Sequence, residues 1–275
     1  MTLAFLLYKY FPYGGMQRDF RRFVEECQRR GHHCRVYYHS WQGEALAGVD
    51  MRAVQVSALS NPRRNERYLR WVSEDLQREP VDGVIGFNKM PGLDVYFAAD
   101  SCYVDWVESK RSRLRRMGPR YRHFAEWERV VFAVGGETEI LLISDSEREK
   151  FERHYHTEPE RLHMLPPGIS PDRRAGPDAR ERRERTRQSL GLDGDTHVLL
   201  FVGSGFRKKG LDRAIRAVAG LRSQAPDQPV RLLIAGQDRE FWFRRLARKL
   251  GVDGVVDFLG GRDDVADLML AADAL

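Results

Sequence analysis

The residues best suited to bind phosphate lie in the turn at residues 203–210, between an apolar run and a helical pattern. Gly203 and Gly205 let the backbone approach a ligand closely, and the helix start offers unpaired N–H groups to an anion. Lys208 and Lys209, two of the seven lysines of the chain, add adjacent ammonium groups that suit a diphosphate. The glycine spacing is not that of a Walker loop. We predict a diphosphate site at Gly205, Lys208 and Lys209, and a solvated turn is the alternative interpretation.

A second glycine turn, Gly14-Gly15, follows the first apolar run and opens the first helical pattern. This is the same point in a strand–turn–helix unit, so the free N–H groups of the helix start suit an anion here as well. No third glycine follows at the spacing of the dinucleotide fingerprint, and a tight turn is the competing interpretation. Asp19, one turn into the helix, suits either a ligand or the stabilisation of the helix start.

Two arginines lie in loops that should meet the same ligand. Arg173 follows the Pro-Pro-Gly sequence at residues 166–168, and Arg262 follows a glycine pair at residues 260–261. A guanidinium group binds a diphosphate through two parallel hydrogen bonds. A rigid proline linker accounts for the first segment without a ligand. Pairing with Asp263 or Asp264 is the alternative for Arg262.

Polar residues also follow strand ends in the N-terminal half of the chain. Asn88, Lys89 and Asp100 have the chemistry to orient a hydroxylated acceptor, and Asp100 has the carboxylate to steer a developing charge as a catalytic group. Ordinary loop capping is the alternative for all three. The eight histidines form no metal-ligand cluster, so we expect no metal.

A basic segment at residues 110–122 carries seven cations and no acidic residue, beside aromatic and aliphatic residues that include Trp106. Its cations are Lys110, Arg111, Arg113, Arg115, Arg116, Arg120 and Arg122. This composition suits an anionic membrane surface, at roughly 1 kcal/mol per cation. Nucleic-acid binding and a solvated face over a core helix are the alternatives. We expect a membrane contact and no nucleic acid.

These loops must be positioned by strands that alternate with helices. The expected strands are 2–8, 34–39, 51–56, 84–87, 95–98, 140–144, 197–202, 231–235 and 255–259. The expected helices are 16–30, 65–79, 120–133, 146–155, 211–222, 239–250 and 264–272. Continuous apolar strands separated by helices predict parallel sheets covered on both faces, which is the α/β class. Ligands bind such sheets beyond the carboxyl ends of the strands.

The alternation stops at residues 166–168 and resumes near residue 197, after a polar, arginine-rich stretch to about Arg187. We therefore predict two doubly wound domains, 1–168 and 169–275, that face a cleft. The second has about three strands, and a fourth would begin where the chain stops at Ala274-Leu275. We expect this domain to be incomplete.

Composition excludes several classes of protein. The chain has 275 residues, of which 42% are hydrophobic and 31% charged, a globular balance. No apolar run approaches the ~20 residues of a transmembrane helix, and Lys9 interrupts the first run too soon for a signal peptide. Three cysteines fit neither a disulfide framework nor a zinc site, which favours the cytosol. The net charge of +6 resides mainly in the basic segment and the phosphate-binding turns.

Three runs carry a resemblance to a known family: LYKYFPYGG at residues 7–15, GFNKMPGLDVY at 86–96 and LPPGI at 165–169. They are similar to the lipopolysaccharide core glucosyltransferases of the retaining glycosyltransferase family 4, and the similarity extends over the whole chain. The resemblance implies a GT-B fold and transfer of glucose from UDP-glucose to an inner-core heptose by an α-1,3 linkage, without a metal. It also implies a peripheral location on the cytoplasmic face of the inner membrane.

The resemblance implies roles for the residues already singled out. The implied donor-binding residues are Gly15, Asp19, Arg173, Gly205, Lys208, Lys209 and Arg262. Asn88, Lys89 and Asp100 fall on the acceptor side, Asp100 near the catalytic region, and residues 103–132 match a membrane-interacting segment. As UDP departs, the lysines and Arg173 would stabilise its charge, and a phosphate oxygen would help to deprotonate the acceptor on the same face, giving retention.

One expected part of the family's site falls outside the sequence. Two glutamates eight positions apart, which contact the donor in the family, should lie beyond residue 275, so we expect little activity from residues 1–275 alone. A transferase that uses another hexose or acceptor is the alternative enzyme. A basic membrane- or RNA-binding module is the alternative without catalysis.

Overall fold

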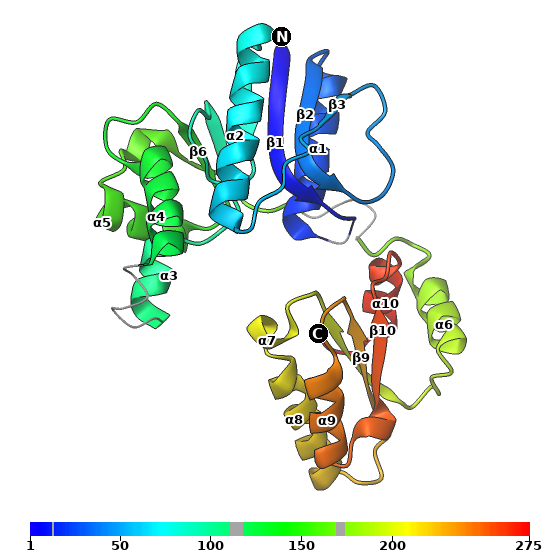
Figure 1. Ribbon diagram of the computed structural model, residues 1–275. Coiled ribbons are helices and arrows are strands. Elements are labelled where there is room, and N and C mark those ends of the chain that lie inside the picture. The colour runs from blue at the N-terminus through cyan, green and yellow to red at the C-terminus, as the bar shows by residue number, and fades with distance from the viewer. Residues whose placement is uncertain (13, 111–117, 169–173) are drawn as a thin grey trace. The chain divides into compact units, whose positions relative to one another are not determined.

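Figure 1 shows the computed structural model of the chain, which describes residues 1–12, 14–110, 118–168 and 174–275. The chain divides into two compact units, Met1–Pro167 and Gly168–Leu275. Each unit is built on one parallel sheet with helices on both faces. The predicted α/β class with two doubly wound sheets is confirmed.

The first unit contains a seven-stranded parallel sheet in the order β3-β2-β1-β4-β5-β6-β7. Its strands are β1 (Thr2–Tyr10), β2 (His33–Trp41), β3 (Asp50–Ala53), β4 (Gly83–Gly86), β5 (Val95–Ala98), β6 (Glu139–Leu142) and β7 (Leu162–Met164). The order reverses beside β1, where β2 lies on one side and β4 on the other. Such a switch point opens a crevice at the carboxyl ends of the strands.

Helices cover both faces of this sheet because β1 is apolar on both. Ala4 and Leu6 face the core under α2, α4 and α5, whereas Phe5 and Leu7 face the core under α1. Figure 1 shows helices on the two sides of β1. The helices are α1 (Gly15–Arg29), α2 (Asn61–Arg78), α3 (Tyr103–Lys110), α4 (Pro119–Phe132) and α5 (Asp145–Tyr155), with a 3₁₀ turn η2 (Pro159–Arg161).

The second unit contains a three-stranded parallel sheet in the order β10-β9-β8. Its strands are β8 (His197–Val202), β9 (Val230–Ala235) and β10 (Val256–Gly260). Its helices are α6 (Ala179–Ser189), α7 (Phe206–Lys209), α8 (Leu211–Gln224), α9 (Phe241–Lys249) and α10 (Val265–Ala271), with a 3₁₀ turn η4 (Asp253–Val255). The core under α7, α8 and α9 lies on one face of the sheet, and Leu268 of α10 belongs to the core on the other. Ala274 bridges in parallel to Leu199 of β8.

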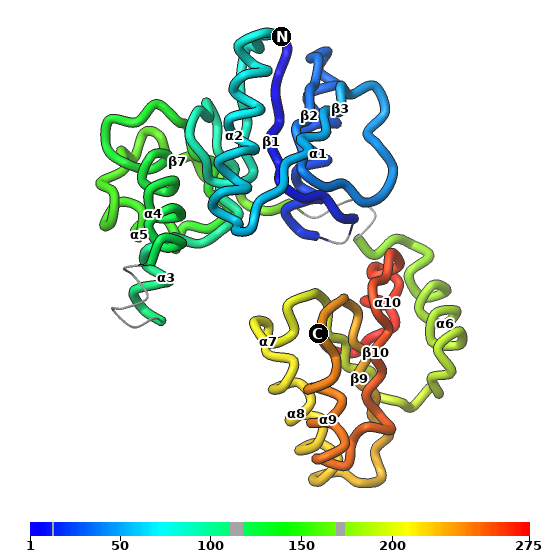
Figure 2. The backbone as a smooth tube through the Cα atoms, in the orientation of Figure 1, coloured from blue at the N-terminus to red at the C-terminus, as the bar shows by residue number. Residues whose placement is uncertain are grey.

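The structure corrects the arginine-rich stretch that the sequence left without structure. Residues 179–189 form α6, which lies beside α10 (Figure 2). Arg187 is only 7% exposed and donates hydrogen bonds to the carbonyls of Asp193 and Thr196, each at 2.7 Å, and of Ala271 at 3.1 Å. Because α6 is held by arginine side chains rather than by an apolar stripe, hydrophobic periodicity does not reveal it.

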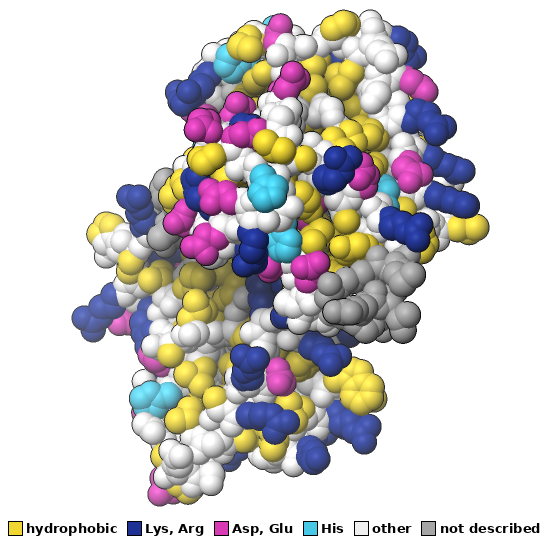
Figure 3. Space-filling model, turned by 90° about the vertical axis from the view of Figure 1, so that its left-hand side faces the viewer, with side chains coloured by type: hydrophobic (Ala, Val, Ile, Leu, Met, Phe, Trp, Pro, Cys, Tyr) yellow, Lys and Arg dark blue, Asp and Glu magenta, His cyan; other side chains and the backbone are white. Residues whose placement is uncertain are grey.

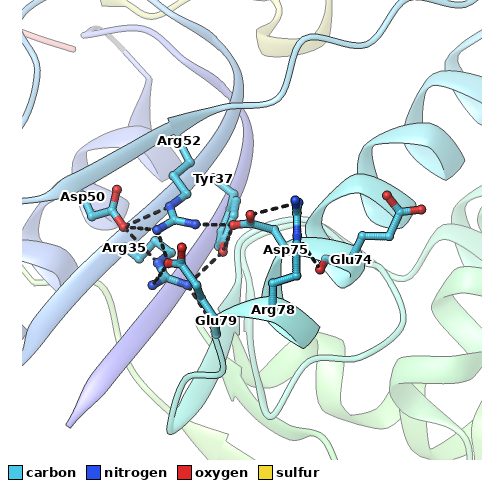
Figure 4. A network of polar contacts seen from close by, with 8 residues as sticks. All are labelled: Arg35, Tyr37, Asp50, Arg52, Glu74, Asp75, Arg78 and Glu79. Atoms are coloured by element: carbon cyan, nitrogen blue, oxygen red, sulfur yellow. Dashed lines mark hydrogen bonds and ion pairs between the residues drawn. The ribbon is translucent and has the colours of Figure 1, made fainter.

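A network of ion pairs joins β2, β3 and the end of α2 in the first unit (Figure 4). Arg52 lies 2.5 Å from the Asp75 carboxylate and also pairs with Asp50 and Glu79. The Tyr37 hydroxyl donates to Asp75 at 2.8 Å. Burial opposes ionisation of Asp75, but these donors outweigh it and lower its pKa. The network therefore ties the sheet to α2.

Replacing Asp75 with Asn tests this network. The depressed pKa means that Asp75 contributes stability above its unfolded pKa and loses it as pH falls. We expect the free energy of unfolding of the variant to be about 2 kcal/mol lower than that of the unchanged protein at pH 7. This difference should narrow below about pH 4. Urea-induced unfolding at several pH values measures both effects. Glu74→Gln, an exposed neighbour on α2, is the control. A pH-independent difference would contradict the assignment.

Candidate functional site

The carboxyl ends of the three strands of the second unit meet in closely packed glycine turns. The Gly203 N–H donates to the carbonyl of Ala235, and the Gly236 N–H to that of Gly260, each at 2.7 Å. A Cβ atom on Gly236 would lie 2.5 Å from the carbonyl oxygen of Gly203. Gly236 therefore has room for main chain only, and the backbone of these turns is the floor over which the Lys209 side chain lies.

Lys208 and Lys209 belong to the short helix α7, and the Lys209 side chain reaches this floor. Phe206, which is fully buried, anchors the helix against the rings of Phe201 and Phe243. A Cβ atom on Gly203 would lie 1.9 Å from Nζ of Lys209, so this ammonium group is directly over the glycine turn. Both lysine residues are exposed. The structure thus brings together the glycines and the cations that the sequence assigned to a diphosphate.

The helix that follows the turn differs from a simple anion-binding helix start. Gly205 and Gly210 both adopt left-handed conformations, with φ of 77° and 81°, and they limit α7 to one turn before α8 begins at Leu211. The first N–H of α7, that of Phe206, donates to the Asp238 carboxylate at 2.8 Å. A phosphate at this turn would therefore meet the lysine ammonium groups, because Asp238 occupies the N–H of Phe206.

Arg262 lies in the loop after β10 and pairs with Asp264. Its guanidinium donates two hydrogen bonds to this carboxylate, at 2.7 and 2.5 Å. The same contact lowers the pKa of Asp264, although burial works against the shift. The alternative that the sequence left open for Arg262, pairing with a neighbouring acid, is the arrangement in the structure. Arg173 lies outside the described residues.

The turn between β1 and α1 presents Gly15 at the first position of the helix. Gly15 is exposed, and a Cβ atom there would meet nothing within 4 Å. The N–H groups of the first helical turn have no partners within the helix. Asp19 lies 3.7 Å from Arg22 and is partly buried. Burial raises the pKa of Asp19, and Arg22 and Arg18 oppose this shift. The turn is open to an anion, with one carboxylate nearby.

The three acceptor-side candidates have different environments. The side-chain oxygen of Asn88 accepts the backbone N–H of Tyr8 at 2.9 Å, which holds the β4–β5 loop against β1. Lys89 is 13% exposed and donates to the Ser101 carbonyl at 3.0 Å and to Glu128. Asp100 is exposed just beyond the carboxyl end of β5. Of the three, Asp100 is the side chain most open to solvent.

Glu128 is a buried carboxylate that the sequence interpretation did not single out. It is fully buried and pairs with Lys89. It also accepts hydrogen bonds from the Tyr155 hydroxyl at 2.6 Å and from the N–H groups of Tyr103 and Val104 at 2.7 and 3.0 Å. The available signal was an acid directly after Trp127, on the face of the helix that carries the buried Val131. A carboxylate there needs cationic and N–H partners from elsewhere in the fold.

Helices α3 and α4 carry the described part of the basic segment. Trp106 is 40% exposed and stacks with Tyr103 at a centroid distance of 6.4 Å. Tyr103 also contacts Phe124, over whose ring Arg120 lies at 5.6 Å. Lys110, Arg120 and Arg122 are exposed. Arg111, Arg113, Arg115 and Arg116 lie outside the described residues. Cations and aromatic rings thus share one surface in the first unit.

Two features are absent from the residues that the structure describes. No group of three or more His, Cys, Asp or Glu side chains among them is arranged to hold a metal ion. None of their helices is both long enough and apolar enough to cross a membrane.

Comparisons with known proteins match both halves of the chain to glycosyltransferase families. Residues 13–173 match the family model "Glycosyltransferase Family 4", and residues 182–275 match "Glycosyl transferases group 1". The chain is 46% identical over 275 residues to the lipopolysaccharide glucosyltransferase WaaG of Escherichia coli K12, which covers 100% of this chain and 73% of that protein. It is 32% identical over 142 residues to a D-inositol 3-phosphate glycosyltransferase of Corynebacterium kroppenstedtii, covering 49% of this chain and 31% of that protein.

Solved structures are similar in the same way. The crystal structure of WaaG matches with a TM-score of 0.93 and 46% identity, over 98% of this chain and 73% of that one. Anabaena Alr3699/HepE, solved in complex with UDP and glucose, matches with a TM-score of 0.67 and 17% identity, over 99% of this chain and 72% of that one. At this lower identity the similarity concerns the fold alone.

Glu128→Gln tests the buried cluster of the first unit. The amide cannot neutralise Lys89, which is left as an uncompensated buried charge. We expect the free energy of unfolding to fall by about 3–5 kcal/mol. Tryptophan fluorescence during urea unfolding measures this, since Trp41, Trp71, Trp106 and Trp127 all lie in this unit. Glu126→Gln is the control, because Glu126 is 53% exposed. Equal losses in the two variants would refute the role of Glu128.

Proposed function

Because the chain belongs to glycosyltransferase family 4, we propose that it is a lipopolysaccharide glycosyltransferase that moves glucose from UDP-glucose to an inner-core heptose. The support is a relative named a lipopolysaccharide glucosyltransferase that is 46% identical along all of this chain. The family resemblance in the sequence is confirmed by the same comparison and by the match to the WaaG fold. The α-1,3 linkage and retention of configuration are part of the proposal.

The position of Lys209 carries the proposal for the donor site. Its ammonium lies over Gly203, at the carboxyl edge of a parallel sheet where such folds bind ligands. Lys208 precedes it in the same exposed turn. As the bond from glucose to UDP breaks, negative charge grows on the diphosphate, and ammonium groups fixed at this point would stabilise it. Loss of one such donor typically costs about 10²–10³ in rate.

Further groups complete the proposed donor site. In the first unit, Gly15 at the open first turn of α1 and the nearby Asp19 are proposed donor-binding residues. Arg173 would add a guanidinium contact to the diphosphate. Arg262 would contribute on the uridine side, and it must then exchange or share its pairing with Asp264. The cations take the charge that a metal neutralises in other transferases, so we propose a reaction without a metal.

The acceptor chemistry follows from the negative charge that grows on the departing diphosphate. In the proposed retaining step, a phosphate oxygen of the departing UDP accepts the proton of the acceptor hydroxyl, which attacks the same face of the sugar. Asp100, exposed beyond β5, is the proposed acceptor-side catalytic group. Asn88 and Lys89 would act mainly by holding the β4–β5 loop, since their polar atoms bond to the protein. Asp100 therefore orients the acceptor in this proposal.

The location follows from the acceptor, which is a lipid. We propose that the enzyme works on the cytoplasmic face of the inner membrane as a peripheral protein. The surface of α3 and α4 supports this location, because it exposes aromatic and cationic side chains of the kind that bind an anionic bilayer. These side chains are Trp106, Lys110, Arg120 and Arg122. Nucleic acid is not a partner in this proposal.

Thermal stabilisation by UDP tests the donor site directly. A ligand that binds the native state raises its stability, by about 2.7 kcal/mol at 100 times its Kd. We expect UDP to raise the Tm of this chain and the double variant Lys208→Ala/Lys209→Ala to lose most of the shift. Arg216→Ala, which removes an exposed cation from α8, should keep it. An unchanged shift in the double variant would remove the lysines from the site, and no shift in any form would favour a non-catalytic module.

The donor sugar and the acceptor are tested by turnover of this protein, in which even a slow release of UDP can be compared between substrates. We expect release of UDP with UDP-glucose and heptose-terminated lipopolysaccharide, and much slower release with UDP-galactose. Activity should persist in the presence of EDTA. A preference for another hexose would leave the family assignment intact and replace the proposed donor.

A further inference from the structure

Helix α9 exposes two large aromatic side chains that its folding does not require. Phe243, Leu246 and Ala247 face inward and belong to the core under α8 and α9. Phe241 and Trp242 lie outside that core, 63% and 67% exposed. Exposed aromatic side chains that occur as a pair indicate a contact surface.

Cations surround this pair on the same helix. Arg245 follows Phe241 by four residues and Trp242 by three, a spacing that places them on one face. Arg248 and Lys249 continue this face, and all three cations are exposed. The helix contains no acidic residue. We call Phe241, Trp242, Arg245, Arg248 and Lys249 the α9 surface.

Neighbouring helices extend the positive charge. Arg213 and Arg216 are exposed on α8, which packs beside α9 on the same face of the sheet. Figure 3 shows Lys and Arg side chains over the visible face of this unit, in the lower part of the view, with hydrophobic side chains exposed between them. On α6, at the other face of the sheet, Arg180 and Arg185 instead pair with acidic residues of their own helix. Among the described residues, the exposed cations named on α8 and α9 have no such acidic partner, in contrast to the two arginines of α6.

We propose that the α9 surface binds an anionic lipid bilayer. Trp and Phe side chains partition into the interface between headgroups and acyl chains, and the cations beside them attract anionic headgroups. Single-stranded nucleic acid is the rival with similar chemistry. It favours rings on which successive bases stack in parallel, whereas the Phe241 and Trp242 rings meet edge to face at 79°. The ring geometry thus favours the bilayer.

The topology keeps this surface clear of the end of the chain. The N–H of Leu200 donates to the carbonyl of Ala274 at 2.9 Å, so the last residues pair with β8. β8 is one edge of the sheet and β10 is the other. Since α9 connects β9 to β10, a strand added at β8 extends the sheet on the side away from α9. The described end of the chain therefore lies at the edge of the sheet away from α9.

The α9 surface belongs to the second unit and is separate from the membrane contact proposed for α3 and α4 in the first unit. Five residues separate the carboxyl end of β9 from the start of α9, so the aromatic pair of α9 lies at the end of the sheet that also carries the glycine turns. A bilayer bound there would approach the same end of the unit as Lys208 and Lys209. Membrane binding by the α9 surface does not depend on which sugar the donor carries.

Vesicle binding of the whole chain tests the proposal. We expect binding to vesicles of phosphatidylglycerol and phosphatidylethanolamine and little binding to phosphatidylcholine alone. Phe241→Ala/Trp242→Ala and Arg245→Ala/Arg248→Ala/Lys249→Ala should each weaken it at least about tenfold. Arg180→Ala/Arg185→Ala, which removes exposed arginines from α6, is the control and should bind normally.

A second measurement locates Trp242 itself. Brominated lipids should quench part of the tryptophan emission, and Trp242→Phe, which preserves an aromatic side chain, should remove that part while keeping the binding. Trp106→Ala/Arg120→Ala/Arg122→Ala tests the other membrane surface. If only that variant weakens binding, the α9 proposal is wrong and the membrane location under the proposed function stands. Binding of single-stranded RNA that anionic vesicles do not displace would also overturn it.

Discussion

The first unit is organised around one buried charge, the carboxylate of Glu128. A fully buried carboxylate is tolerated only where cations and N–H or O–H donors surround it, and here they come from the β4–β5 loop, the start of α3 and the end of α5. Lys89 also lies 5.6 and 5.5 Å from the rings of Phe132 and Phe151, which limits its movement further. The charge thereby holds the β4–β5 loop through Lys89 and fixes where α3 begins, three residues after Asp100. The acceptor-side loop and the aromatic helix are consequently positioned by the same group.

In the second unit, the loops at the strand ends are positioned by main-chain packing instead of by a buried ion pair. Its three strands end in turns that pack together only because residues 203 and 236 are glycines. A lysine ammonium group lies over the backbone of these turns. Arg187 plays the supporting role at the other side of the unit by satisfying carbonyls near α10 and β8. The cationic charge of the proposed donor site is therefore placed on a rigid base, while the lysine side chains that carry it are exposed.

Local patterns predicted the elements, and long-range pairings decided the roles of several residues. Strands 95–98 and 197–202 occur as predicted, because a continuous apolar run between helices has few other interpretations. Helix α6 was missed, because its buried residue is Arg187, which bonds to carbonyls instead of completing an apolar stripe, and one of these carbonyls, that of Ala271, is 84 residues away in sequence. The same reason hid the partnership of Lys89 with Glu128, which are 39 residues apart. By contrast, the pairing of Arg262 with Asp264 is local, and the sequence had already offered it as an alternative.

The packing at Gly236 has a consequence for how donor preference can change over evolutionary time. A side chain there would overlap the Gly203 carbonyl, so this position offers no route to a new pocket shape. Diversification toward other sugar nucleotides must then proceed through residues that border the floor, such as Ser204, whose hydroxyl accepts the N–H of Gln237 at 3.2 Å. The fold thus separates positions that accept only glycine, such as Gly236, from neighbouring positions that tolerate substitution, such as Ser204. Directed evolution of the proposed donor site should be confined to the second kind of position.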